Sequence, residues 1–161
     1  MKKPFWDKRI LLFIGTPGLG KTDFFSRLGE WVGENFDSAR YYLETSLLGR
    51  MKNDISEGTG SWEGNLRYLV DDDLVVLDDV ARWAVKNGEF NPDRNEWARE
   101  VFQEFLDLRY NKRLPTIITS NLNRQQLKLL YGDRVASRLF ATENTFIECF
   151  DPNLDLRSQG L

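Results

Sequence analysis

The chain has 161 residues, which fits a single domain covering 1–161, and hydrophobic residues make up 41% of it. A formal net charge of −3 argues against nucleic-acid binding through bulk positive charge. One cysteine and no histidine exclude an internal disulfide framework and the usual zinc ligands. The apolar runs are far shorter than the roughly 20 residues that cross a bilayer, so we expect a cytoplasmic protein without membrane contacts.

Short apolar runs alternate with helical patterns along the chain, which indicates an α/β fold with a parallel sheet flanked by helices. Five runs are predicted strands: 10–14, 41–43, 74–77, 116–119 and 145–150. Helical spacing predicts a helix at 24–32, two short helices within 46–70, and a helix that ends near residue 110. Two more helical segments are predicted after Asn123, the second at 134–139. Asn91 and Pro92 are interpreted as the N-cap and first residue of the helix that ends near 110, and Asn123 as a further N-cap.

The first predicted strand leads directly into the pattern G-x-x-x-x-G-K-T. Glycines let the backbone curl so that several N–H groups point at one phosphate chain, and the following helix places its positive end there. The lysine adds a charge for the β- and γ-phosphates, and the threonine offers a hydroxyl to Mg²⁺. We therefore predict a loop that binds ATP or GTP with Mg²⁺, made of Gly15, Thr16, Pro17, Gly18, Leu19, Gly20, Lys21 and Thr22.

A pair of carboxylates, Asp78 and Asp79, follows the third predicted strand. In open α/β sheets, ligands bind in the crevice beside the carboxyl ends of the strands. We interpret Asp78 as a metal ligand and Asp79 as the group that orients or deprotonates an attacking water, which predicts a hydrolytic site. The acidic run 71–73 before this strand is interpreted as an exposed turn.

Two further groups of polar residues fit such a site. Asn121 follows the fourth predicted strand, where an amide either holds the attacking water or only begins a turn. Arg134 and Arg138 are four residues apart and share one helix face. A solvated face or a local salt bridge explains this pair, and so does an arginine finger that acts on a neighbouring subunit. The spacing alone leaves these alternatives open.

Four stretches together resemble the DnaC/DnaI/IstB group of AAA+ ATPases: GTPGLGKT, LVVLDDV, DLRYNKRLPTIITSNL and YGDRVASRLF. The resemblance covers nearly the whole chain. It implies a P-loop NTPase fold of the AAA+ type, with a five-stranded parallel sheet flanked by helices and no C-terminal helical lid. The group usually carries an N-terminal segment that grips a helicase, and here the first strand begins near residue 9. We expect an excised ATPase domain or a compact phage or plasmid homologue.

The resemblance also assigns roles to the candidate residues. Lys21 and Thr22 match the Walker A positions, and the Asp78-Asp79 pair matches Walker B. Asn121 matches sensor 1. The box that contains the arginine finger is matched by Arg134 and Arg138, and which of the two would act in trans is left open.

The group comprises bacterial replicative helicase loaders and transposition helper ATPases. The resemblance therefore implies an ATPase that needs Mg²⁺, is stimulated by oligomerisation and acts in DNA replication as a helicase loader-like factor. The implied partners are a replicative DNA helicase, single-stranded DNA and further copies of the chain that share an ATP site. An IstB-like transposition helper, a weakly hydrolysing nucleotide-binding adaptor of replication and a small-molecule kinase remain as alternatives.

Loaders of this group contact single-stranded DNA through the region after the second strand, which is 47–62 here. Arg50, Lys52 and Trp62 suit a backbone groove with base stacking, although acidic neighbours dilute the charge and a plain surface loop fits equally well.

A second basic cluster is formed by Arg109, Lys112 and Arg113. It lies at the predicted end of a helix, where the helix dipole explains it adequately.

Overall fold

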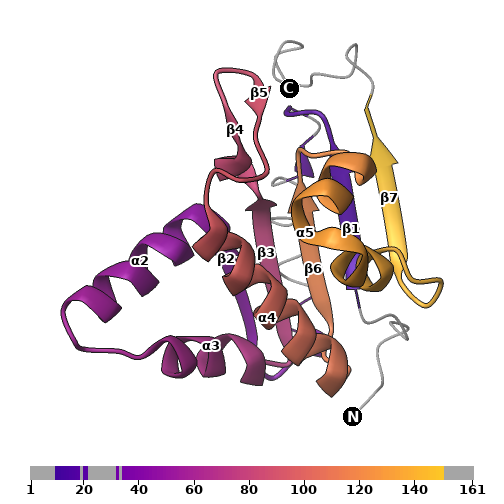
Figure 1. The fold of residues 1–161 in the computed structure, drawn as a ribbon. Helices are drawn as coiled ribbons and strands as arrows, with labels where there is room; N and C mark the ends of the chain where they lie inside the picture. Colours follow the sequence, from indigo (N-terminus) through magenta and orange to yellow (C-terminus); the bar gives the residue numbers. More distant parts are fainter. Residues whose placement is uncertain (1–9, 19, 22–31, 33, 151–161) are drawn as a thin grey trace.

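The computed structural model describes residues 10–18, 20, 21, 32 and 34–150, and its centre is a parallel sheet (Figure 1). The sheet has five strands in the order β2-β3-β6-β1-β7. Every pair of neighbouring strands is parallel, which confirms the predicted α/β fold. The strand bounds are Ile10–Gly15 for β1, Ala39–Leu43 for β2, Leu74–Val80 for β3, Thr116–Ser120 for β6 and Thr145–Cys149 for β7.

Helices cover the face of the sheet that is turned toward the viewer in Figure 1. In the described part of the chain, α4 (Glu96–Lys112) and α5 (Arg124–Leu139) lie in front of the sheet in this view, and α2 (Glu44–Ser56) and α3 (Trp62–Asp71) extend to its left. None of these helices is long and apolar enough to cross a bilayer. The helix predicted at 24–32 lies outside the described residues, apart from Val32.

The three central strands β1, β3 and β6 are buried on both faces, as expected for the centre of a parallel sheet. Because neighbouring side chains point to opposite faces, Leu12 and Ile14 join the large core under α2, α3, α4 and α5. Leu11 points the other way and packs with the side chains of β3 and β6 that point to the same face. Val32 and Phe36 cover this second, smaller cluster. The sheet is therefore held rigidly, and its strand ends can position polar side chains.

A small hairpin separates β3 from α4, and the sequence analysis did not predict it. It follows the short helix η1 (Arg82–Ala84) and consists of β4 (Val85–Lys86) and β5 (Glu89–Phe90). In Figure 1 it rises above the end of β3. Because the hairpin continues to residue 90, the predicted N-cap at Asn91 is wrong.

The start of α4 is four residues later than predicted. The Asn95 side chain caps it by accepting the backbone N–H of Ala98 at 3.1 Å. Asn91 instead accepts the backbone N–H of Asp93 at 2.9 Å, a local turn contact.

The helical segments after β6 follow the predicted pattern. Asn123 forms a capping box with Gln126: each side chain accepts the other residue's backbone N–H, at 2.8 and 3.0 Å. Gly132, with φ of 78°, breaks α5 into two segments, and the second carries Arg134 and Arg138. The cap and the glycine together fix where this second segment lies against α4.

Arg109 does not belong to a surface basic cluster, which corrects the sequence interpretation. Its side chain is 0% exposed and lies between the end of α3 and the start of β6. The guanidinium donates to the Thr116 hydroxyl at 2.8 Å and to four backbone carbonyl oxygens, those of Leu69, Val70, Asp72 and Pro115. Burial lowers its pKa to about 10, with the charges of Asp72 and Asp73 opposing the shift.

The acidic run 71–73 is likewise more than an exposed turn. Asp72 is buried and forms an ion pair with Arg40 of β2 at 2.9 Å. Asp73 exchanges two hydrogen bonds with Ser38, through its carboxylate at 3.1 Å and its backbone N–H at 2.9 Å. Only Asp71 is exposed as predicted, where it pairs with Lys112. These contacts tie the start of β3 to β2.

Candidate functional site

The C-terminal ends of three strands lie side by side, because β3, β6 and β1 are consecutive neighbours in the parallel sheet. Ser120 of β6 is in register with Ile14 of β1 and with Val80 of β3. The acidic pair on β3 and the asparagine after β6 therefore lie next to the start of the phosphate loop. This edge is the crevice in which open α/β sheets bind ligands.

The phosphate loop begins where β1 ends, and the Lys21 side chain is buried against it. Its Nζ donates to the carbonyl oxygens of Gly15 at 2.9 Å and Thr16 at 2.8 Å. Gly18 and Gly20 have φ of 92° and 70°, a conformation that glycine adopts without strain. The ammonium group is thus held over the loop, where phosphate oxygens are equivalent acceptors. Leu19 and Thr22 of the predicted loop lie outside the described residues.

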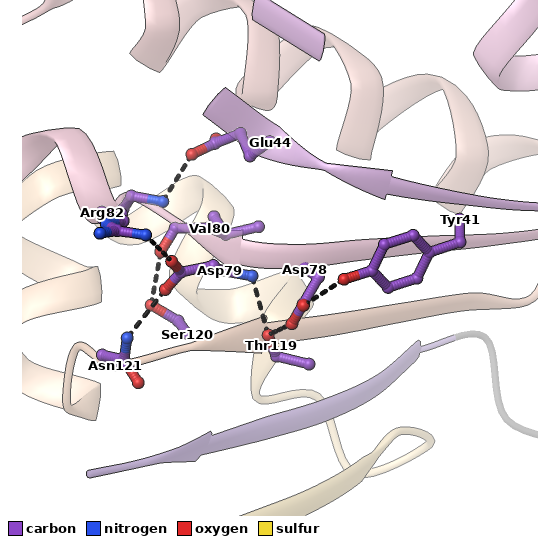
Figure 2. A network of polar contacts seen from close by, with 10 residues as sticks. Tyr41, Glu44, Asp78, Asp79, Val80, Arg82, Thr119, Ser120 and Asn121 are labelled. Atoms are coloured by element: carbon purple, nitrogen blue, oxygen red, sulfur yellow. Dashed lines mark hydrogen bonds and ion pairs between the residues drawn. The ribbon is translucent and has the colours of Figure 1, made fainter. Parts of the chain in front are cut away.

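Asp78 is buried, and hydroxyl groups from two neighbouring strands hold its carboxylate (Figure 2). Thr119 of β6 donates to Oδ1, and Tyr41 of β2 donates to Oδ2 at 2.5 Å. Partial burial, reinforced by this bond to Asp78, raises the pKa of the Tyr41 hydroxyl above its ordinary value, so it remains a donor. A carboxylate oxygen can accept more than one hydrogen bond, so Asp78 can also accept from a metal-bound water.

Asp79 lies in an irregular part of β3 and contacts Asn121 directly. Its φ is 57°, and the register with β6 shifts between Leu77 and Val80. Its backbone N–H donates to the Thr119 hydroxyl at 2.9 Å. The Asn121 Nδ2 donates to Asp79 Oδ1 at 2.8 Å, and the exposed Arg82 donates to Oδ2 at 3.3 Å (Figure 2). Bulges of this kind re-aim side chains beside functional sites.

The residues at this edge fit a nucleotide with Mg²⁺. Within the described ranges, no group of three or more acidic, histidine or cysteine side chains could hold a metal ion alone. Mg²⁺ commonly takes one or two carboxylates, substrate phosphates and waters, and Asp78 beside the phosphate loop offers that combination. Asn121 Oδ1 is buried and has no hydrogen-bond partner among the described residues, so it can accept from a water placed next to Asp79.

The arginine pair lies at another place in the fold. Both side chains pair with Asp107 of α4: Arg134 contacts Oδ2 at 2.6 Å and Arg138 contacts Oδ1. The Arg138 side chain is 17% exposed, and its guanidinium lies 5.6 Å from the centre of the Tyr110 ring. Arg134 is 74% exposed. The local salt bridge that the spacing allowed is present, and Arg134 presents the larger surface to solvent.

Sequence reasoning missed the side chains that support the acidic pair. Tyr41 and Thr119 appear in the sequence as ordinary strand residues, and the arrangement of β2, β3 and β6 brings them to Asp78. Glu44 starts α2, where an acidic residue usually signals only a favourable helix dipole. It is buried, and its Oε2 accepts the backbone N–H of Ala81 at 2.7 Å (Figure 2).

Comparisons with known proteins agree with this fold. No protein-family model matches the chain. The replicative helicase loader DnaC of Buchnera aphidicola subsp. Acyrthosiphon pisum (strain APS) is 25% identical over 129 residues, which are 80% of this chain and 49% of the relative. The chain thus spans about half the length of the curated relatives it matches.

Among solved structures, the DnaC helicase loader superimposes with a TM-score of 0.68 at 24% identity, over 88% of this chain and 78% of that one. The replication initiator DnaA bound to AMPPCP and single-stranded DNA has a TM-score of 0.68 at 20% identity, over 86% and 39%. At these identities the likeness shows the fold.

The chain therefore shares the fold of the DnaC and DnaA ATPase domains, an α/β fold with a parallel sheet that fits the predicted P-loop architecture. Among the proteins that the chain resembles, the curated relatives are replicative helicase loaders named DnaC, and the solved structures with this fold include DnaC and DnaI.

Proposed function

We propose that this domain binds ATP with Mg²⁺ and hydrolyses it. The observation that carries the proposal is the direct contact between Asp79 and Asn121, formed beside the phosphate loop and next to a buried Asp78. A nucleotide-binding adaptor without hydrolysis needs the loop but has no use for an acidic pair fixed by neighbouring strands. The contact therefore favours hydrolysis.

Each residue has a defined task in this proposal. Lys21 exchanges its carbonyl contacts for phosphate oxygens and holds the end of the phosphate chain. Mg²⁺, when bound, neutralises charge on the phosphates, and Asp78 with Thr22 would hold it. Asp79 accepts a proton or hydrogen bond from the attacking water, and Asn121 Oδ1, which no described residue engages, accepts a second hydrogen bond from that water. The water is thereby oriented toward the γ-phosphate.

The arginine pair completes the site from a second copy of the chain. Charge on the transferred phosphoryl group needs a cation, and arginine supplied by a neighbour is a common solution. Arg134 and Arg138 are held on the α4–α5 surface by Asp107. We therefore propose a homo-oligomer whose ATP sites are shared between subunits. An arginine would leave Asp107 when it engages a neighbouring nucleotide.

The biological role that we propose is that of a helicase loader-like factor in DNA replication. Its support is the name of the curated relatives, replicative helicase loaders, and the structural neighbour DnaA, which binds single-stranded DNA. We propose a replicative DNA helicase and single-stranded DNA as partners.

Segment 47–62 remains our proposal for the DNA contact. Arg50 and Lys52 are exposed on α2, the first 5.9 Å from the Tyr42 ring and the second 4.9 Å from the Trp97 ring. The Trp62 side chain lies outside the described part.

Nucleotide titration of Lys21→Ala tests the site. We expect tight ATP binding to be lost, because the variant removes the only lysine of the loop. Lys52→Ala, which removes an exposed lysine from α2, is the control and should bind ATP normally. Unchanged affinity in Lys21→Ala would contradict the site assignment. A pull-down of a replicative helicase with and without ATP tests the partner.

A further inference from the structure

The backbone of the turn 79–81 is unusual at two of its residues. Asp79 and Ala81 both have left-handed φ, at 57° and 65°. Aspartate tolerates this conformation because its short polar side chain bonds locally, whereas alanine rarely adopts it. The strain of the turn is therefore concentrated at Ala81. A conformation of this kind persists only where the surroundings fix it.

One neighbouring strand and one helix fix this turn. From β6, Thr119 accepts the backbone N–H of Asp79, and the Ser120 hydroxyl donates to the Val80 carbonyl at 2.7 Å. From the other side, Glu44 Oε2 accepts the backbone N–H of Ala81 at 2.7 Å. Figure 2 shows the turn between these two sets of bonds. The strained residue is thus held by Glu44.

Glu44 is well placed for this task because it cannot move into solvent. It is 2% exposed and is the first residue of α2, directly after β2. The Trp83 indole is close enough to oppose the rise in the pKa of Glu44, and the Glu44 charge acts on the buried Tyr131 of α5. Burying a carboxylate is costly unless its bonds repay it, so a purely structural position would favour an apolar residue.

We infer that Glu44 is a positioning residue for the attacking-water site: it holds the strained turn 79–81 and thereby the Asp79 carboxylate. The inference rests on the proposed hydrolysis. Glu44 touches neither nucleotide nor water in this account, because its bond goes to the backbone two residues beyond Asp79. Its loss should therefore lower the rate of turnover while the phosphate loop still binds ATP.

Three variants of Glu44 separate positioning from folding. Gln keeps an oxygen acceptor for Ala81 N–H and should retain most of the turnover. Met fills the space without an acceptor, and we expect it to lower kcat about tenfold to a hundredfold while KM changes less than about threefold. Should Met fail to fold, Asp provides the same comparison, because its shorter side chain does not reach Ala81.

The matched control is Met51→Ala, about two turns further along the same buried face of α2. It destabilises the helix without touching the turn, so kcat should stay near the wild-type value at a temperature where the protein is folded. A loss of kcat in Met51→Ala equal to that in Glu44→Met would overturn the inference, and so would normal kcat in folded Glu44→Met.

Ala81→Gly gives an independent readout. Glycine adopts the left-handed conformation without strain, so it should restore several-fold turnover to Glu44→Met and change the wild type little. Additive effects of the two substitutions would contradict the inference. If the wild type shows no turnover, the proposed function fails, and the same cycle measured as urea midpoints still tests whether Glu44 holds the turn.

Discussion

Replacing Glu44 by Gln should change how stability depends on pH, because the carboxyl is buried. Burial raises the pKa of Glu44 to about 8 from an ordinary 4.5, with the nearby Asp79 charge adding to the shift and the Ala81 N–H and Trp83 indole opposing it. Between these two values the folded protein keeps a proton that the unfolded chain has released. Stability should therefore be greatest at low pH in this window and fall as pH rises toward 8.

The size of this effect follows from the two pKa values. As pH rises from 6 to 8, Glu44 lowers the unfolding free energy of the wild type by about 2 kcal/mol. For a protein of this length that is about 4–8 °C in Tm. Glutamine does not titrate and keeps the acceptor for Ala81. Glu44→Gln should therefore gain about 2 kcal/mol relative to the wild type between pH 6 and pH 8.

Urea unfolding of both proteins at pH 6 and pH 8 measures this difference, and other titrating groups cancel in the comparison. Asp79 and Tyr131 are the titratable groups that face Glu44, and both remain in the variant. Glu57→Gln, at the exposed end of the same helix, controls for the loss of one negative charge. Parallel pH profiles for wild type and Glu44→Gln would refute the reasoning.

Two further substitutions test other parts of the structure. Arg109→Met should lower stability by about 3 kcal/mol or more, because it leaves buried carbonyl oxygens without a hydrogen-bond donor. Lys112→Met, at the exposed end of α4, should cost less than about 0.5 kcal/mol in the same urea titration. Replacing Arg134 or Arg138 by Ala should reduce ATP turnover without weakening ATP binding, and mixing such a variant with Lys21→Ala should restore part of the turnover. An absence of rescue for both arginines would place their action within one subunit.

The sequence predicted the sheet, and it indicated the residues of the candidate site that gather at the strand ends, because both rest on local signals. Apolar runs marked the five strands, and the glycine-rich motif after the first marked the phosphate loop. The acidic pair and Asn121 follow neighbouring strands, so the strand order brings them together at 2.8 Å. Asn123 was recognisable as a cap because its side chain bonds the residues directly after it.

Features that depend on distant contacts were missed or misread. The β4–β5 hairpin left one usable signal, Asn87-Gly88, whose φ values of 53° and 79° are those of a tight hairpin turn. Arg109 follows Phe102 and Phe105 on the apolar face of α4, a spacing that pointed to burial, but its charge suggested the surface. Glu44 and Tyr41 gave no signal at all, since their partners are far away in sequence.

The most direct test of the central claim compares ATP hydrolysis with ATP binding in the Asp79→Asn variant. Asparagine keeps the size of the side chain but is a much weaker base and changes the bonds to Asn121 and Arg82. We expect ATP to bind with near wild-type affinity while Mg²⁺-dependent hydrolysis falls at least about a hundredfold. Normal hydrolysis by this variant would contradict the assignment of Asp79 and show that another group orients the water.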